Sequence, residues 1–407
     1  MTTDAAVTYP RWGALTPARA RIHDKSMSAF VIPRFFHDPT ITFLNHGSFG
    51  STPQPLLEAQ NALRAQMEAE PVRFMMRELP ALLNEARQAA ATFLGGDPAE
   101  LAFVTNATTG VNAVLASFPD LGPGDELLTT SHVYGAVWQT LRHKARQTGC
   151  SLVMAPIPLP IADPGRIIDA VVGAMGPRTR LLVLDQITSP TAMVWPVEPI
   201  LEAARAHGIP VLLDGAHAPG HIPVDLGALR PDFWVGNLHK WLCAPKGCAV
   251  LHVDRRHQGW LHSPSISHLY EGGLHAEFDW PGTFDPTAWL CAPAAIALHE
   301  AMGGAHLRAA HFALARQGAA IVAEAVGTAL PIGHDSLVGA MALISLPADP
   351  ALALRIKDAL LDQHHIEVPI IAWDGHLFVR ISAFSAYNRV EHYQHLAAAL
   401  PQVLAAL

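Results

Sequence analysis

The segment LLVLDQITSPTAMVWPVEPILEAARAHGIPVLLDGAHAPG, residues 181–220, predicts the fold of this chain. Two apolar runs, 181–186 and 211–216, flank an amphipathic stretch over 197–208 that ends at Gly208, as a helix C-terminus does. Runs that are apolar along nearly their whole length are typical of strands covered on both faces, as in a parallel sheet between helices. The segment therefore predicts one strand–helix–strand unit of a parallel sheet.

The same alternation continues on both sides of this segment, from about residue 55 to residue 285. Strands alternating with helical stretches in this way predict a doubly wound α/β domain. The further apolar runs are LAFVT (101–105), ELLTT (126–130), FWVGN (233–237) and AVLHV (249–253).

The pattern changes after Pro286. An Ala-rich helical region over 287–328 comes first. It is followed by an apolar run at 341–347, a helix near 350–362 and the two apolar runs IEVPII and HLFVRISA. Together these elements predict a smaller α+β domain. The first stretch of the chain, rich in Pro and Arg, is typical of an arm that folds back on the body or on a partner subunit. We therefore divide the chain into an N-terminal segment joining the small domain (1–54), a large domain (55–285) and a small domain (286–407).

The composition excludes several classes of protein. The 407 residues are 50% hydrophobic and 15% charged, which is too apolar for a disordered chain. A net charge of −8 disfavours a surface for nucleic acid or another polyanion. No apolar run approaches the roughly 18 residues of a membrane helix, and the N-terminus lacks the apolar core of a secretion signal. We expect a cytoplasmic protein whose four cysteines are reduced thiols, namely Cys150, Cys243, Cys248 and Cys291.

The 23 histidines include no HExxH motif and no His/Cys cluster with ligand spacing, so we expect no metal site. His299, His306 and His311 fall in the Ala-rich helical region, where we expect solvated side chains.

Polar residues at the ends of the apolar runs carry the candidate chemistry, because ligands of parallel sheets bind where strands end. After the run at 101–105, Thr108 and Thr109 stand at a predicted helix N-terminus, which suits a phosphate but is also ordinary helix capping. Asp214 ends another run, where a carboxylate needs a cation or caps the next helix, and His217 follows three residues later.

Lys240 and Arg380 are the two cations that stand beside or within apolar runs. Lys240 follows Asn237 and His239 and precedes Trp241, so a solvated position is hard to explain. A buried lysine forms an ion pair or acts as a nucleophile through a lowered pKa. Arg380 lies within an apolar run, where its planar guanidinium suits a substrate carboxylate.

Along the chain, a phosphate loop is followed by a strand-end aspartate, a lysine and a C-terminal arginine. This order resembles that of the pyridoxal-phosphate enzymes of aspartate-aminotransferase fold, called fold type I. The chain is similar more narrowly to the class V aminotransferase family, from FLNHGSFGS (43–51) to RISAFSAYN. The resemblance implies a large domain with a mostly parallel seven-stranded sheet, pyridoxal 5'-phosphate as cofactor, and a homodimer with its active site at the subunit interface.

The resemblance also implies residue roles. Lys240 would hold the cofactor as a Schiff base, Asp214 would pair with the ring nitrogen, and His217 would lie beside the phenolic oxygen. Tyr134 would stack on the ring or merely pack in the core, and Thr283 would reach a phosphate across the dimer interface or merely cap a turn. Arg380 would bind the substrate carboxylate. The phosphate would be held by Thr108, Thr109, Asn237 and His239.

The fate of the substrate after Cα–H cleavage stays open among several outcomes. Desulfuration by the usual route needs a cysteine shortly before the carboxylate arginine, and residues 362–380 contain none; Cys291 lies too early in the chain. Four segments together resemble the isopenicillin N epimerase branch of the family, namely NHGSFGSTP (45–53), EPVRF (70–74), DGAHAPG and HIEVPIIAW. We therefore expect an epimerase or racemase acting at the α-carbon of an amino acid through a Cα carbanion.

The alternatives are a β-eliminating C–S lyase and an aminotransferase. A non-enzymatic module would be expected to lack the lysine, which is present. A second proton carrier for epimerisation would come from His217, His46 or Tyr134. Asn45, His46 and Arg73 are candidate substrate contacts, although Arg73 could equally form an ion pair on a helix surface.

Overall fold

The computed structural model describes residues 30–407, and Val31–Leu407 form one compact unit. Most of the predicted N-terminal arm lies outside the described residues. The boundaries predicted at 54 and 285 fall within the compact unit and stay a prediction.

A seven-stranded sheet forms the centre of the larger part, in the order β2-β8-β7-β6-β5-β3-β4. All neighbouring strands are parallel except at β8, which runs antiparallel to both β2 and β7. This confirms the predicted mostly parallel sheet of a fold type I enzyme. The strands are β2 (Leu101–Val104), β3 (Glu126–Thr130), β4 (Ser151–Ala155), β5 (Thr179–Asp185), β6 (Val211–Asp214), β7 (Phe233–Asn237) and β8 (Ala249–Val253).

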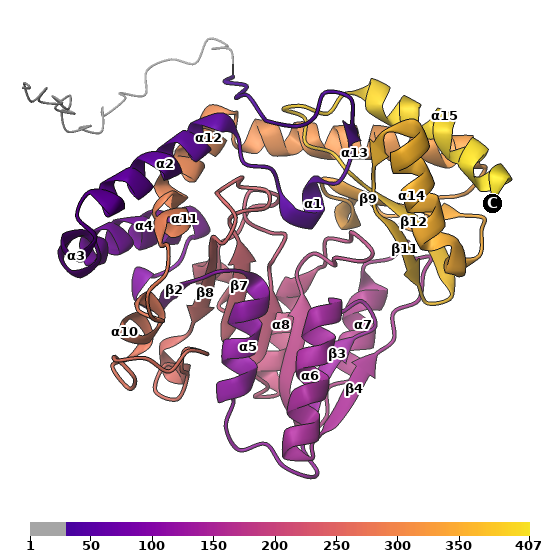
Figure 1. Ribbon diagram of the computed structural model, residues 1–407. Helices are drawn as coiled ribbons and strands as arrows, with labels where there is room; N and C mark the ends of the chain where they lie inside the picture. Colours follow the sequence, from indigo (N-terminus) through magenta and orange to yellow (C-terminus); the bar gives the residue numbers. More distant parts are fainter. Residues whose placement is uncertain (1–29) are drawn as a thin grey trace, which may run out of the picture. The chain divides into compact units, whose positions relative to one another are not determined.

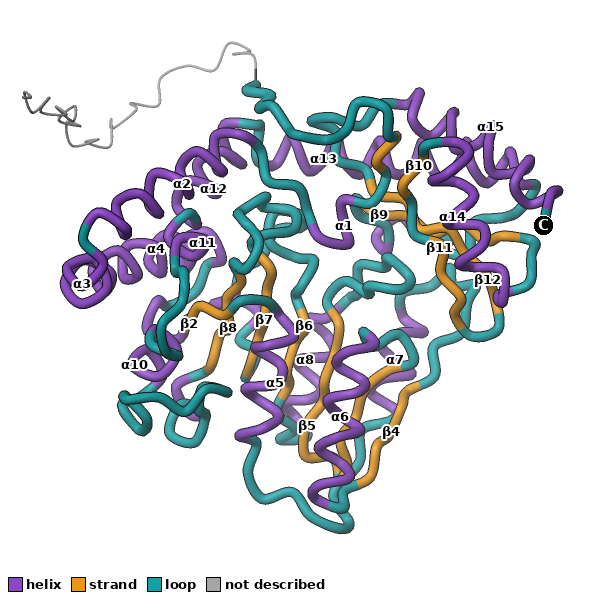
Figure 2. The backbone as a smooth tube through the Cα atoms, in the orientation of Figure 1, coloured by secondary structure: helices purple, strands orange, loops and turns teal. Residues whose placement is uncertain are grey.

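Helices cover both faces of this sheet, because successive side chains of each buried strand point to opposite faces. Leu212 packs in a core cluster with α5 (Ala107–Ser117) and α6 (Gly135–Thr148). Leu213 packs in the cluster on the other face, against α7 and α8, and the layers can be followed in Figures 1 and 2. The helices in and around that second cluster are α2 (Gln54–Ala69), α4 (Leu79–Leu94), α7 (Gly165–Gly173), α8 (Val197–Ala206), α11 (Thr287–Leu290) and α12 (Ala292–Ala301).

A three-stranded antiparallel sheet in the order β11-β12-β9 packs with three long helices in a separate core cluster. A short parallel pair joins β1 (Thr42–Phe43) to β10 (Ile366–Glu367), so the start of the described chain adds to this C-terminal part. Its elements are α13 (Ala305–Val326), β9 (Met341–Leu346), α14 (Ala353–His364), β11 (Ile370–Trp373), β12 (His376–Ser382) and α15 (Val390–Ala406).

Short helices make the remaining connections. They are α1 (His46–Phe49), α3 (Pro71–Arg73), a π-helical turn (Phe74–Glu78), α9 (Leu226–Leu229) and α10 (Leu274–Asp279), with 3₁₀ turns at Pro98–Glu100, Arg255–His257, Asp335–Leu337 and Pro350–Leu352.

Every strand predicted from an apolar run is present, and the helix predicted over 197–208 ends at Ala206 with Gly208 at a φ of 67°. The edge strand β4 was not predicted, because it is partly exposed and its apolar pattern is weak. The expectation of solvated histidines was wrong for His299 and His311, which are both buried. Each has a polar contact that makes burial tolerable: His311 with the Ser385 hydroxyl, and His299 with Arg308.

Three further observations bear on the predicted class of protein. The four cysteines are all buried and unpaired. Among the described residues, none of the helices has the length and apolarity required to cross a membrane. Within 30–407, no three His, Cys, Asp or Glu side chains are grouped so as to hold a metal ion.

Candidate active site

A cavity of about 300 Å³ opens where the parallel strands β6 and β7 end. The short helix α1 contributes to its wall and is tied to β12 by a hydrogen bond from the Gly47 N–H to the Ser382 hydroxyl. Seven of the predicted site residues line the cavity, namely Thr108, Tyr134, Asp214, His217, Asn237, His239 and Lys240.

Lys240 lies in the loop after β7, with its amine facing this cavity. Its Nζ is 3.1 Å from Nε2 of His217. Burial, followed by the nearby charge of Arg380, lowers the pKa of Lys240 from 10.5 to about 7, against the opposing attraction of Asp214. The amine is therefore substantially neutral near pH 7, which is the form that attacks an aldehyde.

Asp214 is the last residue of β6 and is buried, with only 4% of its surface exposed. One carboxylate oxygen accepts a hydrogen bond of 2.9 Å from the Ala216 N–H. Burial raises the pKa of Asp214, and the Ala216 N–H and Lys240 only partly oppose this. A buried carboxylate in this state gains stability from a cationic N–H partner, such as a protonated pyridine ring.

His217 is also buried, and its two ring nitrogens differ in their contacts. Nε2 meets Lys240, whereas Nδ1 has no hydrogen-bond partner among residues 30–407. Burial, together with the charge of Lys240, holds the pKa of His217 well below its usual range, so the ring is neutral. An unpartnered buried nitrogen that lines a cavity fits a ligand that carries a hydroxyl or phenolate oxygen.

The N-terminus of α5 forms another part of the wall. Asn106 caps the helix by accepting the Thr109 N–H, and the Asn237 side chain accepts the Ala107 N–H at 2.8 Å. Thr108 and His239 line the cavity beside this helix end, and a helix N-terminus with hydroxyl and imidazole groups suits a phosphate. The Nδ1 of His239 contacts the Cys248 carbonyl, and burial lowers the His239 pKa to about 4.

Arg380, on β12, lies directly behind the cavity wall. Its guanidinium donates to the Ser48 hydroxyl at 3.1 Å and to the backbone carbonyl of Ser189, and both serines line the cavity. Burial lowers the pKa of Arg380 to about 10, which still leaves the guanidinium charged at neutral pH. The site therefore holds one fixed positive charge next to two hydroxyl groups.

The NHGSFG segment supports this wall from behind. Asn45 accepts a hydrogen bond from the Ser48 hydroxyl at 2.5 Å and donates to Glu367. His46 is fully buried, with Nδ1 2.7 Å from the Tyr387 hydroxyl and Nε2 3.1 Å from the Lys240 carbonyl oxygen. Asn45 and His46 thus contact residues of the wall and are not themselves among the residues that line the cavity.

Gly50 shows why glycine is needed in this segment. Its φ is 67°, and a Cβ at this position would lie 2.1 Å from the His239 carbonyl oxygen and 2.7 Å from the Lys240 Cα. The backbone of the segment can approach the lysine loop this closely only without a side chain.

Three predicted site residues lie apart from the cavity of this chain. The Thr109 hydroxyl is engaged by Thr105 and Asn106 at the start of α5. Arg73 is exposed and pairs with Glu78 at 2.7 Å on the helix surface. Thr283 is exposed in the loop between α10 and α11.

Sequence reasoning missed Ser48 and Ser189, and also Asp185. Asp185 ends β5 directly opposite Asp214 and is 3% exposed. Burial and the neighbouring Asp214 carboxyl hold the pKa of Asp185 well above its usual range. The signal that singled out Asp214, a carboxylate at the end of an apolar strand, is equally present in LLVLDQ.

The residues present fit pyridoxal 5'-phosphate. They supply a lysine amine with a pKa lowered to about 7, a buried carboxyl suited to a ring cation, an unpartnered imidazole nitrogen and a helix N-terminus for the phosphate. Fold and site together define a pyridoxal-phosphate enzyme of fold type I.

The chain belongs to the class V aminotransferase family. The family's sequence profile, aminotransferase class-V, matches residues 43–334. The isopenicillin N epimerase of Streptomyces clavuligerus is 34% identical over 385 residues, covering 90% of this chain and 96% of that protein. The putative L-cysteine desulfhydrase 1 of Oryza sativa subsp. japonica is 32% identical over 408 residues, covering 91% of this chain and 84% of that protein.

Solved structures share the fold. The cystine C–S lyase C-DES, in complex with its reaction product cysteine persulfide, superimposes with a TM-score of 0.74 at 23% identity over 89% of this chain and 97% of that chain. The cysteine desulfurase CsdA of Escherichia coli also gives 0.74, at 20% identity over 92% of this chain and 97% of that chain.

Proposed function

We propose that this enzyme epimerises or racemises an amino acid at its α-carbon, as the relatives named isopenicillin N epimerase suggest. The observation that carries the proposal is the Lys240 amine, with its pKa near 7, in contact with His217 at the cavity wall. A group that is neutral near the working pH and can also carry a proton is suited to general-base catalysis.

When bound, pyridoxal 5'-phosphate supplies an electron sink that makes the Cα–H bond of an attached amino acid acidic. Lys240 would hold the cofactor, and its amine would take the Cα proton of the substrate. Asp214 would keep the ring nitrogen protonated, because a buried carboxylate is stabilised by that cation. Thr108, His239 and Asn237 would hold the phosphate, and Tyr134 would contact the ring.

Arg380 orients the substrate in this proposal. Its charge lies behind Ser48 and Ser189, so an α-carboxylate that displaces their contacts would pair with the guanidinium. A carboxylate fixed by Arg380 would determine which bond at Cα is cleaved, and therefore that the proton is the group removed.

Epimerisation also needs a proton donor on the face away from Lys240. His46 is buried behind the wall, and His217 contacts Lys240 itself. Tyr134 lines the cavity at the start of α6 and is 43% exposed. We assign the second proton transfer to the Tyr134 hydroxyl.

A C–S lyase is the second candidate. It is favoured by the desulfhydrase relatives and by the fold shared with C-DES. Elimination needs the same proton removal by Lys240 but no donor on the opposite face, because the leaving thiolate departs from the side chain. Transamination would require the Lys240 amine to return its proton to the cofactor.

We further propose a homodimer. Phe49, which lines the cavity, is 75% exposed, and Thr283 lies exposed in the loop after α10. A partner copy packed at this mouth would cover Phe49 and bring its own Thr283 loop toward the phosphate.

The test is a screen of L-amino acids with the holoenzyme in D₂O, followed by NMR of the Cα position, chiral chromatography and keto-acid analysis. We expect exchange of the Cα proton with formation of the D-isomer. Tyr134→Phe should keep Cα exchange but lose the D-isomer, whereas Tyr270→Phe, at a tyrosine of similar exposure elsewhere, should behave as the unmodified enzyme. Pyruvate and sulfide from L-cysteine without any D-isomer would replace the epimerase proposal with the lyase.

A further inference from the structure

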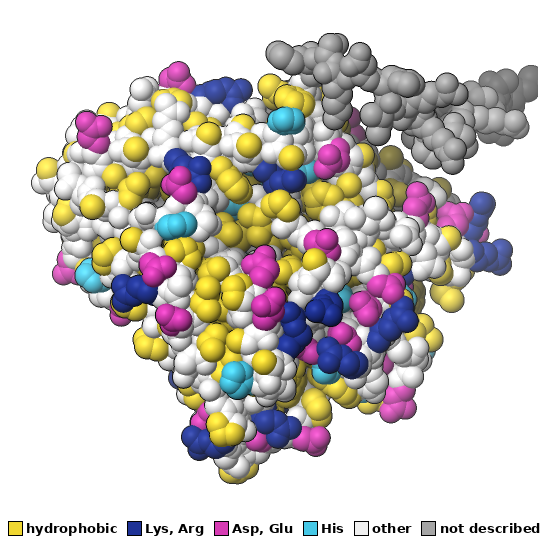
Figure 3. All heavy atoms as spheres, turned by 180° about the vertical axis from the view of Figure 1, so that it is seen from behind, with side chains coloured by type: hydrophobic (Ala, Val, Ile, Leu, Met, Phe, Trp, Pro, Cys, Tyr) yellow, Lys and Arg dark blue, Asp and Glu magenta, His cyan; other side chains and the backbone are white. Residues whose placement is uncertain are grey.

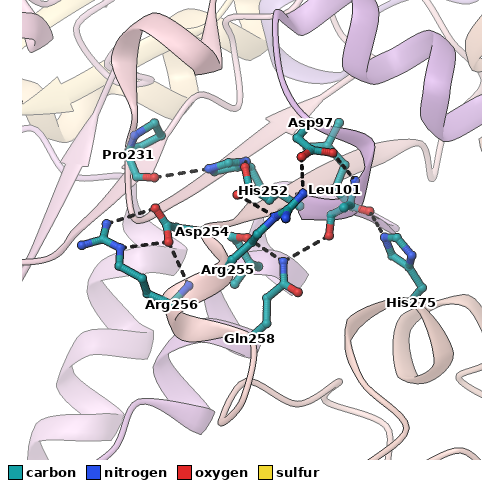
Figure 4. Close-up of polar contacts among 12 residues, drawn as sticks. Asp97, Leu101, Pro231, His252, Asp254, Arg255, Arg256, Gln258 and His275 are labelled. Carbon is teal, nitrogen blue, oxygen red and sulfur yellow. Dashed lines mark hydrogen bonds and ion pairs between the residues drawn. The ribbon is translucent and has the colours of Figure 1, made fainter.

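Charged side chains near the start of β7, away from the active-site cavity, pair with one another. Figure 4 shows Asp97 bound to Arg255 at 2.5 Å. It also shows Asp254 bound to Arg256 at 2.9 Å. On the face of the molecule in Figure 3, acidic and basic side chains likewise lie next to one another. Since these charges already have partners, they do not indicate a ligand site, and the polar groups that bear on the chemistry lie instead behind Lys240.

The short helix α1 connects the two cations of the proposed mechanism, Lys240 and Arg380. His46, its first residue, lies with Nε2 3.1 Å from the Lys240 carbonyl oxygen. Two residues later, the Ser48 hydroxyl accepts a hydrogen bond of 3.1 Å from the Arg380 guanidinium. Between them, the Gly47 N–H donates to a hydroxyl at the end of β12 at 3.0 Å. Three consecutive residues therefore fix α1 to the loop after β7 and to β12, and Figure 1 shows α1 between the large sheet and the C-terminal part.

The two ring nitrogens of His46 have fixed hydrogen-bond roles. A backbone carbonyl oxygen can only accept, so Nε2 carries the proton that is donated to Lys240. Burial, helped by the nearby charge of Lys246, holds the pKa of His46 well below its usual range, so the ring is neutral and Nδ1 is an acceptor. The Tyr387 hydroxyl, 2.7 Å from Nδ1, is therefore the donor to it. The result is a chain of two hydrogen bonds that runs in one direction, from Tyr387 through His46 to Lys240.

The surroundings of His46 hold this chain in place. The imidazole stacks on Phe384 with ring centroids 4.2 Å apart, and it packs against Trp241 at 4.8 Å. The Lys240 carbonyl oxygen also accepts the Cys243 N–H at 3.1 Å, which closes the turn after the lysine. A carbonyl oxygen has two lone pairs, so both are used and the peptide unit of Lys240 is held in a single orientation.

The orientation of this peptide unit sets the direction in which the Lys240 side chain leaves the backbone. Its Nζ lies 3.1 Å from Nε2 of His217. A catalytic base has to be held within about 0.5 Å of its productive position for efficient proton transfer. Because α1 also holds Ser48 against Arg380, one helical turn sets the place of the base relative to the cation that would bind the substrate carboxylate.

We propose that His46, oriented by Tyr387, is a positioning residue that holds the Lys240 amine in place relative to Arg380 for removal of the Cα proton. The role rests on the proposed function of Lys240 as that base, but not on whether epimerisation or elimination follows. His46 does not act as a proton donor to the substrate, because both of its nitrogens are engaged and it is not among the residues that line the cavity.

The test separates the two hydrogen bonds of His46. The amide nitrogen of glutamine is as many bonds from Cα as Nε2 of histidine, whereas that of asparagine corresponds to Nδ1. His46→Gln should therefore keep the contact with Lys240, and His46→Asn should lose it while keeping a polar group beside Tyr387. His299→Asn, at a buried histidine of α12, controls for the loss of a buried imidazole.

The first measurement uses cofactor-free protein. Labelling with acetic anhydride over a range of pH, quantified at Lys240 by mass spectrometry, gives the pH midpoint at which the amine becomes reactive, because only the neutral amine reacts. The charged groups that face this amine are Arg380 and Asp214. We expect a midpoint near pH 7 for the unmodified protein, His46→Gln and His299→Asn. His46→Asn should have a higher midpoint, because an amine no longer held within the wall beside Arg380 keeps its proton to higher pH.

The second measurement uses the holoenzyme in D₂O. In His46→Asn, kcat for exchange of the Cα proton should fall about 10- to 100-fold, the usual effect of a base displaced by a fraction of an ångström to an ångström. KM should change little, because Arg380 is still present. Tyr387→Phe should reproduce part of this loss in the unmodified enzyme and none of it in the His46→Gln background, because glutamine has no tautomer for Tyr387 to select.

Far-UV circular dichroism checks that each variant is folded. The proposal is overturned if His46→Gln and His46→Asn give the same midpoint and the same kcat, or if His299→Asn behaves as His46→Asn does. If His46→Asn does not fold, an equal effect of Tyr387→Phe with and without His46→Gln would overturn it instead. A holoenzyme that exchanges the Cα proton of no amino acid would refute the proposed function, whereas the labelling of Lys240 would still test the role of His46.

Discussion

Replacement of Lys240 by methionine should stabilise the cofactor-free protein, and the gain should depend on pH. Methionine keeps the length of the side chain but removes the amine. The pKa of Lys240 is lowered from 10.5 to about 7, chiefly by burial. Folding with a protonated amine at this position therefore costs free energy that the neutral variant avoids.

The magnitude follows from the two pKa values. In the window from pH 7 to 10.5 the unfolded chain binds more protons at this site than the folded chain, so the free energy of unfolding rises with pH there. At 1.36 kcal/mol per pKa unit, the free-energy cost of the lowered pKa reaches its full value of about 5 kcal/mol well below pH 7. The cost is about 4 kcal/mol at pH 7 and falls to about 2 kcal/mol at pH 9. Solvent in the cavity screens part of this cost, so these are upper values.

The assay is urea unfolding of cofactor-free protein and Lys240→Met at pH 7 and pH 9. The variant should be the more stable at both values, with an advantage that shrinks by about 2 kcal/mol at the higher pH. Lys357→Met, on the outer helix α14, controls for the loss of one positive charge. An advantage at Lys240 that is the same at both pH values would refute the lowered pKa, and with it the reasoning that about half of this amine is neutral at pH 7.

Three further changes test the site. Arg380→Lys should raise KM about 30- to 100-fold with little change in cofactor absorbance, because a single ammonium cannot replace the guanidinium that binds both serines; an unchanged KM in steady-state kinetics would remove Arg380 from substrate binding. Asp214→Asn should lower kcat by about two to three orders of magnitude, because that is the usual effect of losing one preorganised electrostatic group. It should also alter the visible spectrum of the cofactor. A normal spectrum together with normal turnover would contradict the pairing of Asp214 with the ring nitrogen. Gly50→Ala should destabilise the protein by at least about 1–3 kcal/mol in thermal unfolding, because a Cβ would meet the backbone of His239 and Lys240; an unaltered Tm would show that the segment can move away.

Much of the fold could be predicted because its signals are local. Strands buried on both faces carry continuous apolar runs, and six of the seven strands of the large sheet were found from such runs. The seventh, Ser151–Ala155, is an edge strand with exposed positions, so its pattern does not differ enough from that of a loop. The burial of His299 and His311 was missed because it depends on segments distant in sequence. His299, on α12, packs against Phe93 of α4, and His311, on α13, contacts Ser385 after β12.

The residues of the site also fall into two groups, those that the sequence indicates and those that only the structure brings together. Lys240, Asp214 and His217 could be predicted to converge, because strand ends of a parallel sheet meet at one edge. Nothing local indicates that Ser48 and Ser189 hold Arg380, since these three residues come from three separate parts of the chain. The sequence left Arg73 open between a substrate contact and an ion pair on the helix surface, and the structure shows the ion pair, with Glu78.

The amino-acid sequence by itself therefore predicted the kind of sheet, because strand periodicity is a property of short segments, and its resemblance to the class V aminotransferase family implied the cofactor. Only the tertiary structure decided which groups surround Lys240 and Asp214: the Asp185 carboxyl opposite Asp214 and the imidazole of His46 behind Lys240. Those relations arise from the packing of residues far apart in the chain, where burial and proximity, rather than residue type, set the charge of each group.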